Sequence, residues 1–262
     1  MELGLAGRVA LVTGGSHGIG RATAQSLAAH GARVALLARD PQWLGAAADE
    51  IASATGSPVL PVPGDVRDAA SVSRAVGQVV EAWGGVHILV NNAGSPGGTT
   101  SGTLDELDEG ALLDDFDTKF LGYLRCAREC ARPMKAAGWG RVVLVGGLSA
   151  RMAGNYTSGF RNLALGHLAR SMAWELGSFG ITVNVVHPGT VRTEDWLDRR
   201  ARQLGVTSAE YEKAAAARTA IGRVVEASEV SDAIAFLASD RAAAISGEVL
   251  VVSGGAGEAV YM

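Results

Sequence analysis

Short apolar runs rich in β-branched residues recur along the chain, separated by segments of helix-forming composition. The seven runs are Val9–Val12, Val34–Leu37, Val59–Val62, Val86–Val90, Val142–Val145, Ile181–Val186 and Val249–Val252. Most of them are continuously apolar rather than alternating, as expected of strands that are covered on both faces. Such strands form parallel sheets with right-handed helical crossovers. The sequence therefore predicts an α/β fold, a doubly wound seven-stranded parallel sheet in one domain spanning residues 1–262.

Composition narrows the classes of function. Glycine supplies 35 of the 262 residues, with neither the three-residue period of collagen nor the low apolar content of a disordered chain. The chain has 23 basic and 27 acidic residues, a net charge of −4, so it lacks the basic excess of a nucleic-acid-binding protein. The longest uncharged stretch, Leu176–Val191, is broken by glycine, asparagine, histidine and proline, and we expect no membrane span.

The first residues of the chain and its cysteines indicate the cellular compartment of the protein. The first residues lack the basic-then-apolar order of a secretory signal. Cys126 and Cys130 lie four residues apart on one expected helix, which is typical of a pair of reduced thiols. These features predict a cytoplasmic protein whose partner is a small molecule rather than a nucleic acid or a membrane.

A glycine-rich turn, Thr13–Gly20, follows the first expected strand and precedes a helix-forming run. Gly14 permits a tight turn, Gly18 allows backbone amides to approach a pyrophosphate, and Gly20 allows close packing of helix on strand. The amino terminus of the helix favours an anion at the same place. The turn therefore predicts a dinucleotide site.

The Thr-Gly-x-x-x-Gly-x-Gly spacing resembles that of the short-chain dehydrogenase/reductase family. Other matching landmarks are Asp65-Val66, Asn91–Gly94, Pro188–Thr193 and Ser246–Gly255, which cover nearly the whole chain. The resemblance implies a Rossmann-like NAD(P)-binding domain and a homodimer or homotetramer paired through helices at Asp115–Ala137 and Ser158–Leu176. The cofactor contacts that it implies are Gly14, Ser16, His17, Gly18, Ile19, Gly20, Arg39, Asp65, Val66, Asn92, Ala93, Gly94, Asn162, Pro188, Gly189, Val191 and Thr193.

The residues at the end of the second expected strand indicate whether the cofactor is NAD(H) or NADP(H). By its distance from Gly14, Arg39 falls where the family reads the 2′ substituent of the adenosine ribose, and His17 occupies a position that is often arginine in NADP enzymes. An arginine attracts a 2′-phosphate, whereas a carboxylate would repel it. We therefore expect NADP(H) to be preferred over NAD(H). In the alternative, Arg39 is a solvated charge and Asp40 caps the next helix.

The four catalytic positions of the family carry different residues in this chain. The family pairs a tyrosine with a lysine four residues later, because a phenol with a pKa near ~10 needs a nearby positive charge to donate its proton at neutral pH. Here Ser158 stands at the tyrosine position and Asn162 at the lysine position. Gly147 replaces the serine, with Ser149 two residues further on, and Lys119 replaces the asparagine.

Three interpretations of this site stay open. Tyr156 could donate the proton from a shifted position, Ser158 could replace the tyrosine, or the site could have lost the family's redox chemistry. Lys119 favours the first two, because its ammonium could supply the charge lost at Asn162, and Arg161 is a second candidate cation. The predicted function is an NADP(H)-dependent reductase of a carbonyl or activated C=C bond, with catalytic candidates Tyr156, Ser158 and Lys119.

The alternative is a non-redox protein, a lyase, isomerase, cyclase or ligand-binding protein, in which the dinucleotide is structural. No metal-ligand spacing is present. His187, at a strand end, is expected to be structural, and the acidic run from Asp105 to Asp115 is expected to be a solvated helix face. Ser95–Thr103 and a helical flap at about Thr193–Arg223 are expected to line the substrate site.

Overall fold

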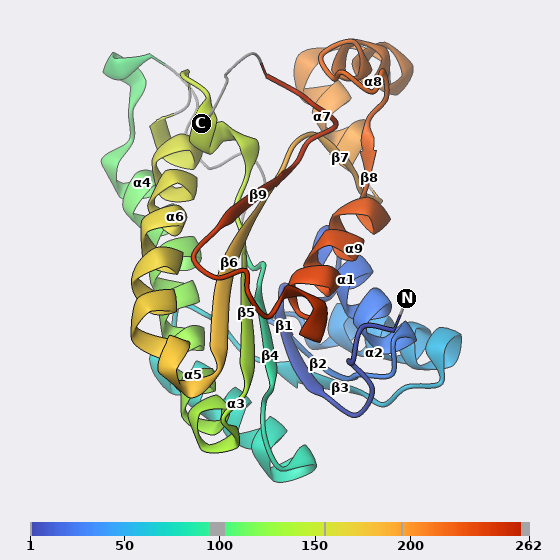
Figure 1. Cartoon of the computed structure of the whole chain (residues 1–262). Helices are drawn as coiled ribbons and strands as arrows, with labels where there is room; N and C mark the ends of the chain where they lie inside the picture. Colours follow the sequence, from blue (N-terminus) through green and yellow to red (C-terminus); the bar gives the residue numbers. More distant parts are fainter. Residues whose placement is uncertain (1, 95–102, 155, 195, 258–262) are drawn as a thin grey trace.

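Seven parallel strands form the central sheet of the computed structural model, which describes residues 2–94, 103–154, 156–194 and 196–257 (Figure 1). Their order across the sheet is β3-β2-β1-β4-β5-β6-β9. This order confirms the doubly wound fold, and each of the seven predicted strands is present. The strands are β1 (Val9–Thr13), β2 (Arg33–Ala38), β3 (Val59–Pro63), β4 (Ile88–Asn91), β5 (Gly140–Val145), β6 (Ile181–Pro188) and β9 (Val249–Val252).

Helices cover both faces of the sheet, which is why most of its strands are continuously apolar (Figure 1). One face packs against α3, α5 and α6, and the other packs against α1, α2 and α9. Cys126 and Cys130 are buried in the first of these layers, and burial raises the pKa of both thiols. The six helices are α1 (Gly18–Ala29), α2 (Pro41–Thr55), α3 (Ala69–Trp83), α5 (Gly122–Ala137), α6 (Tyr156–Leu176) and α9 (Ala227–Leu237).

Local signals set the helix ends. Asp40 caps α2, its Oδ1 accepting hydrogen bonds from the backbone amides of Gln42 at 2.9 Å and Trp43 at 3.2 Å. Gly56 ends α2 with a φ of 72°, in the left-handed region that glycine adopts without strain. Asp40 and Gly56 therefore set the two ends of α2, and the Asp40 cap is the one expected in the alternative for Arg39.

The predicted flap is helical. It contains α7 (Trp196–Leu204) and α8 (Ser208–Ala216), enclosed between the two-residue strands β7 (Val191–Arg192) and β8 (Val225–Glu226). These two strands pair with each other outside the main sheet and anchor the flap at both ends. The other expected substrate segment, Ser95–Thr103, lies outside the described residues except for Thr103.

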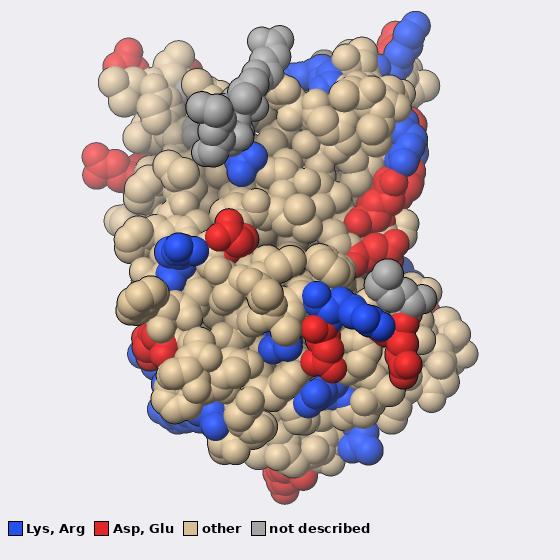
Figure 2. All heavy atoms as spheres, viewed as in Figure 1, with Lys and Arg blue, Asp and Glu red and all other residues tan. Residues whose placement is uncertain are grey.

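The distribution of charged side chains on the surface agrees with the small net charge of −4. Figure 2 shows acidic and basic side chains interspersed on the viewed face rather than gathered into one basic area. Among the described residues, no helix is both long enough and apolar enough to cross a bilayer.

Candidate active site

The glycine turn after β1 is held closed against the end of β4. The Thr13 hydroxyl accepts hydrogen bonds from the amides of Asn92 at 2.9 Å and Ala93 at 3.0 Å. The Asn92 side-chain amide donates to the carbonyl oxygens of Thr13 and Gly14, both at 3.2 Å. A Cβ on Gly20 would lie 2.1 Å from the Gly14 oxygen, so only glycine fits there. These contacts fix the turn at the carboxyl end of β1, where α1 begins.

Side chains beside the turn and β2 lie where the adenosine half of a dinucleotide is expected. Arg39 is exposed at the end of β2, while the Asp40 carboxylate is occupied in capping α2. His17 Nδ1 lies 2.9 Å from Ser16 Oγ, and its ring packs on Trp43 with 5.0 Å between centroids. Trp43 is a neighbour that sequence reasoning missed, because only the folded α2 brings it over the turn.

Two further predicted segments end at the same edge. After β3, the Asp65 carboxylate accepts from the backbone amide of Arg67 at 2.9 Å, and Val66 is buried. After β6, Gly189 lies so close to Ser253 that a Cβ would approach the serine Cβ to 2.8 Å. Thr193 reaches the glycine turn, its methyl group 3.2 Å from where a Cβ on Gly18 would be. Parallel strands thus gather the predicted cofactor residues along one carboxyl edge.

Lys119 lies at this edge, buried between the ends of β4 and β5. It belongs to a π-helical turn, Asp117–Leu121, between α4 (Glu109–Phe116) and α5. Its Nζ donates to the carbonyl of Gly146 at 3.0 Å, and its Cδ lies 3.2 Å from where a Cβ on Gly94 would be. Burial lowers the pKa of Lys119 well below its usual value, and the Arg161 charge acts in the same direction.

An ion pair lies next to Lys119 in the interior. Arg161 Nη1 donates to Asp115 Oδ1 at 2.5 Å, and the two side chains are 2% and 1% exposed. Burial raises the pKa of Asp115, and the charges of Arg161 and Lys119 oppose this. The expectation that the acidic run is solvated is therefore wrong for Asp115, although its neighbour Asp114 is exposed. The four-residue spacing of Asp115 and Lys119 on one helix was the available signal.

The replaced serine and lysine positions are in direct contact. Asn162 Nδ2 donates to Ser149 Oγ at 2.9 Å and lies 2.8 Å from where a Cβ on Gly147 would be. The asparagine amide therefore occupies the space that a side chain at position 147 would need. The Oδ1 of Asn162 is buried and has no hydrogen-bond partner among the described residues. It is an acceptor that a bound molecule can satisfy.

His187 completes the backbone support of the site. Its Nδ1 accepts from the amide of Gly147 at 3.0 Å, which requires the ring nitrogen to be unprotonated. Burial, assisted by the charges of Lys119 and Arg151, lowers the pKa of His187 to about 4. The histidine is thus structural, as the sequence predicts.

The two hydroxyl candidates on α6 differ in burial. Tyr156 is 47% exposed at the start of the helix, whereas Ser158 is 3% exposed. The structure therefore gathers Lys119, Gly147 and Asn162 at the interior end of the site and leaves Tyr156 at its surface.

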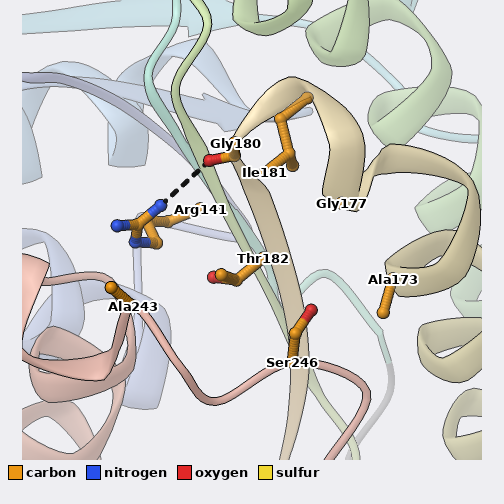
Figure 3. Close-up of a pocket in the computed structure, with 8 residues that line it drawn as sticks. All are labelled: Arg141, Ala173, Gly177, Gly180, Ile181, Thr182, Ala243 and Ser246. Atoms are coloured by element: carbon orange, nitrogen blue, oxygen red, sulfur yellow. Dashed lines mark hydrogen bonds between the residues drawn. The ribbon is translucent and has the colours of Figure 1, made fainter.

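Two of the cavities in the described part of the chain lie at different ends of the strands. One of about 290 Å³ is at the amino ends of β5 and β6, where Arg141 donates to the carbonyl of Gly180 at 3.3 Å (Figure 3). It is at the opposite end of the strands from Lys119 and is not part of the candidate site. The second, of about 610 Å³, lies between α1 and the flap, with Gly18 and Thr193 in its walls.

Comparison with known proteins identifies the family. Residues 14–257 match a family model described as enoyl-(acyl carrier protein) reductase. The chain belongs to the short-chain dehydrogenase/reductase family. The 3-oxoacyl-[acyl-carrier-protein] reductase FabG of Escherichia coli is 35% identical over 251 residues, covering 95% of this chain and 97% of the relative. The short-chain reductase protein NovJ of Streptomyces niveus is 33% identical over 248 residues, 94% of this chain and 93% of its own.

A solved structure agrees with this assignment. L-sorbose reductase from Gluconobacter frateurii, determined in complex with NADPH and L-sorbose, has a TM-score of 0.91 and 29% identity over 98% of each chain. Short-chain dehydrogenases/reductases are NAD(P)-dependent oxidoreductases, and this chain is an enzyme of that class.

The residues present fit the family's dinucleotide. Glycine at positions 14 and 20 lets the turn pack closely on itself and on Asn92, and the amides at the start of α1 can bind a pyrophosphate. The unpartnered Oδ1 of Asn162 can accept a hydrogen bond from a ribose hydroxyl. When bound, the dinucleotide supplies or accepts the hydride.

Proposed function

We propose that the chain is an NADP(H)-dependent reductase of a carbonyl or an activated C=C bond in a small or medium-sized substrate, working with a non-standard active site. The observation that carries the proposal is the buried amine of Lys119 at the ends of β4 and β5, beside Gly94 and Gly146. A titratable group at this edge can transfer a proton to a substrate that is bound against the predicted nicotinamide segment, Pro188–Thr193.

Arg39 supports NADP(H) as the preferred cofactor. The Asp40 cap of α2 is the one expected in the alternative, in which Arg39 is a solvated charge, but the cap also keeps that carboxylate engaged and leaves the exposed guanidinium to meet a 2′-phosphate. L-sorbose reductase was solved with NADPH, which favours the same choice. Ser16 and His17 are proposed to bind that phosphate together with Arg39.

Lys119 is proposed to deliver the proton that carbonyl reduction requires. An amine whose pKa is lowered by burial exchanges a proton closer to neutral pH than an ordinary lysine does. The Asp115–Arg161 pair keeps this amine in an interior with balanced charge. Tyr156, exposed at the start of α6, and Ser158, buried two residues later, are proposed to contact the substrate. Reduction of a polarised C=C bond depends on these two residues less, because solvent can protonate carbon.

This function is tested by fixed-time and continuous assays of NADPH oxidation with a panel of ketones, enones and quinones. Lys119→Met is expected to reduce kcat at least ~100-fold, whereas Lys135→Met, on α5 and ion-paired with Glu175 near the surface, is expected to leave it unchanged. The wild-type rate is expected to fall as pH rises through the pKa of Lys119, because the protonated amine is the donor. Equal rates for the two lysine variants would refute the role of Lys119.

The alternative, a non-redox enzyme or binding protein with a structural dinucleotide, is favoured by one contact. Asn162 fills the space of a side chain at position 147, so no hydroxyl and no cation stands at those two family positions. Three results together would select this alternative. NADPH would bind tightly and stay bound through purification, no member of the panel would oxidise it, and Tyr156→Phe would leave the biological product unchanged.

A homodimer or homotetramer is proposed as the assembly. On α6, the large side chains of Leu163 and Trp174 are 63% and 91% exposed, as expected of an interface between copies. Light scattering after size exclusion tests this: a Trp174→Lys variant is expected to shift the population toward monomer.

A further inference from the structure

The carboxylate of Glu194 lies on the amino terminus of α1. Its Oε2 accepts a hydrogen bond from the amide of Gly18 at 2.9 Å. Its Oε1 lies 3.2 Å from Nη1 of Arg21, one turn further along the helix. Glu194 belongs to the start of the flap, so the flap is fastened to the phosphate-binding turn across 176 residues of sequence.

The charges around this contact favour an anion. Arg21 also forms an ion pair with Glu50 on α2, so its guanidinium is held beside the turn. Partial burial acts to raise the pKa of Glu194, but hydrogen bonds from its own amide and from Gly18, with the Arg21 charge, hold that pKa below its ordinary value. Glu194 is therefore an ionised carboxylate bound where helix geometry and charge attract an anion.

The pyrophosphate of the proposed cofactor needs the same place, so this inference rests on the proposed function. The Gly18 amide has a single hydrogen, and it cannot serve a carboxylate and a phosphate oxygen with full strength at the same time. Two anions side by side would also repel each other. Binding of the dinucleotide therefore requires Glu194 to move.

We propose that Glu194 is an internal competitor for the cofactor's pyrophosphate: it occupies the α1 amino terminus in the free protein, and the dinucleotide displaces it together with the start of the flap. The cavity of about 610 Å³ between α1 and the flap has Arg21 and Glu194 in its walls and gives the displaced side chain room. Thr193, which precedes Glu194, packs on Gly18 and carries the movement to the predicted nicotinamide segment.

Equilibrium binding of NADPH, followed by its fluorescence, tests the proposal without any substrate. Glu194→Gln keeps the size of the side chain and removes its charge, and is expected to lower the Kd for NADPH about 3- to 10-fold. Asp198→Asn is the matched control, because Asp198 lies on the same flap and contacts the Ser208 hydroxyl instead of α1. The difference in Kd for NADPH between Glu194→Gln and the wild type is expected to shrink at high salt, because salt screens the charge of Glu194.

Amide hydrogen exchange gives a second measurement. The Gly18 amide is expected to exchange faster in cofactor-free Glu194→Ala than in the wild type, and inorganic pyrophosphate is expected to restore its protection in the variant. A Kd for Glu194→Gln equal to or above that of the wild type, or unchanged exchange at Gly18, would overturn the proposal. Failure of both proteins to bind NADPH or NADH would instead remove the proposed cofactor, and this inference with it.

Discussion

Replacing Arg161 by methionine is expected to destabilise the protein by about 3–5 kcal/mol. Methionine retains most of the apolar stem but leaves the Asp115 carboxylate buried at 1% exposure without its partner at 2.5 Å. The second oxygen of Asp115, Oδ2, already has no hydrogen-bond partner among the described residues, and of the two charges that favour the carboxylate only that of Lys119 would remain. An unfolding entropy of about 2.1 cal/mol/K per residue converts the loss into a fall in Tm of about 5–9 °C for this chain length.

Thermal and urea unfolding followed by circular dichroism measure this effect. Arg170→Met is the matched control, since Arg170 lies on the same helix and pairs with Glu248 at 3.4 Å while both side chains are more than half exposed. Its loss is expected to change stability by less than ~1 kcal/mol. The double variant Asp115→Leu/Arg161→Met is expected to recover most of the loss, because it removes both buried charges.

The outcome of the double variant decides whether the reasoning holds. Additive losses from the two substitutions would show that the pair is not energetically coupled. Equal shifts in Tm for Arg161→Met and Arg170→Met would show that burial adds nothing to this ion pair. Either result would refute the argument from desolvation.

Three further predictions follow from the same structure. His187 has a pKa of about 4 in the folded protein and ~6.5 in the unfolded chain, so its contribution to the free energy of unfolding is complete above pH ~6.5 and is lost as pH falls toward 4. Urea titrations over this pH range should show the free energy of unfolding fall by about 3 kcal/mol in the wild type, a fall that is absent in His187→Gln. Gly20→Ala places a Cβ 2.1 Å from the Gly14 oxygen and should abolish NADPH binding in a fluorescence titration, whereas Gly45→Ala, with open space around it in α2, should bind normally and unfold at a slightly higher temperature. Asp40→Ala should lower unfolding stability by about 1 kcal/mol through the lost cap of α2, and a change below ~0.3 kcal/mol would contradict this.

The fold was predictable because its signals are local. Most of the strands are continuous apolar runs, and the turn at Thr13–Gly20 needs glycine for reasons of backbone space that hold in any chain. The cap at Asp40 is equally local, since the carboxylate and the amides that it accepts from are within three residues of each other. Such features can be inferred without knowing the tertiary structure.

The interior of the site was less predictable because its contacts join distant segments. Asp115 and Arg161 are 46 residues apart, and nothing in the acidic run distinguishes buried Asp115 from exposed Asp114 except helical phase. The contact of Asn162 with Ser149 depends on how α6 packs over the end of β5. Glu194 reaches Gly18 only because the flap folds back on α1.

The contact between Asn162 and the bare backbone at Gly147 also limits how this active site can be rebuilt. A serine introduced at position 147 alone would push the amide of Asn162 off Ser149, while a lysine introduced at 162 alone would replace that amide and meet no side chain at position 147. The two positions are therefore epistatic, and stepwise engineering toward the usual residues has to pass through an intermediate that fits neither arrangement. A library that varies both positions together avoids that barrier.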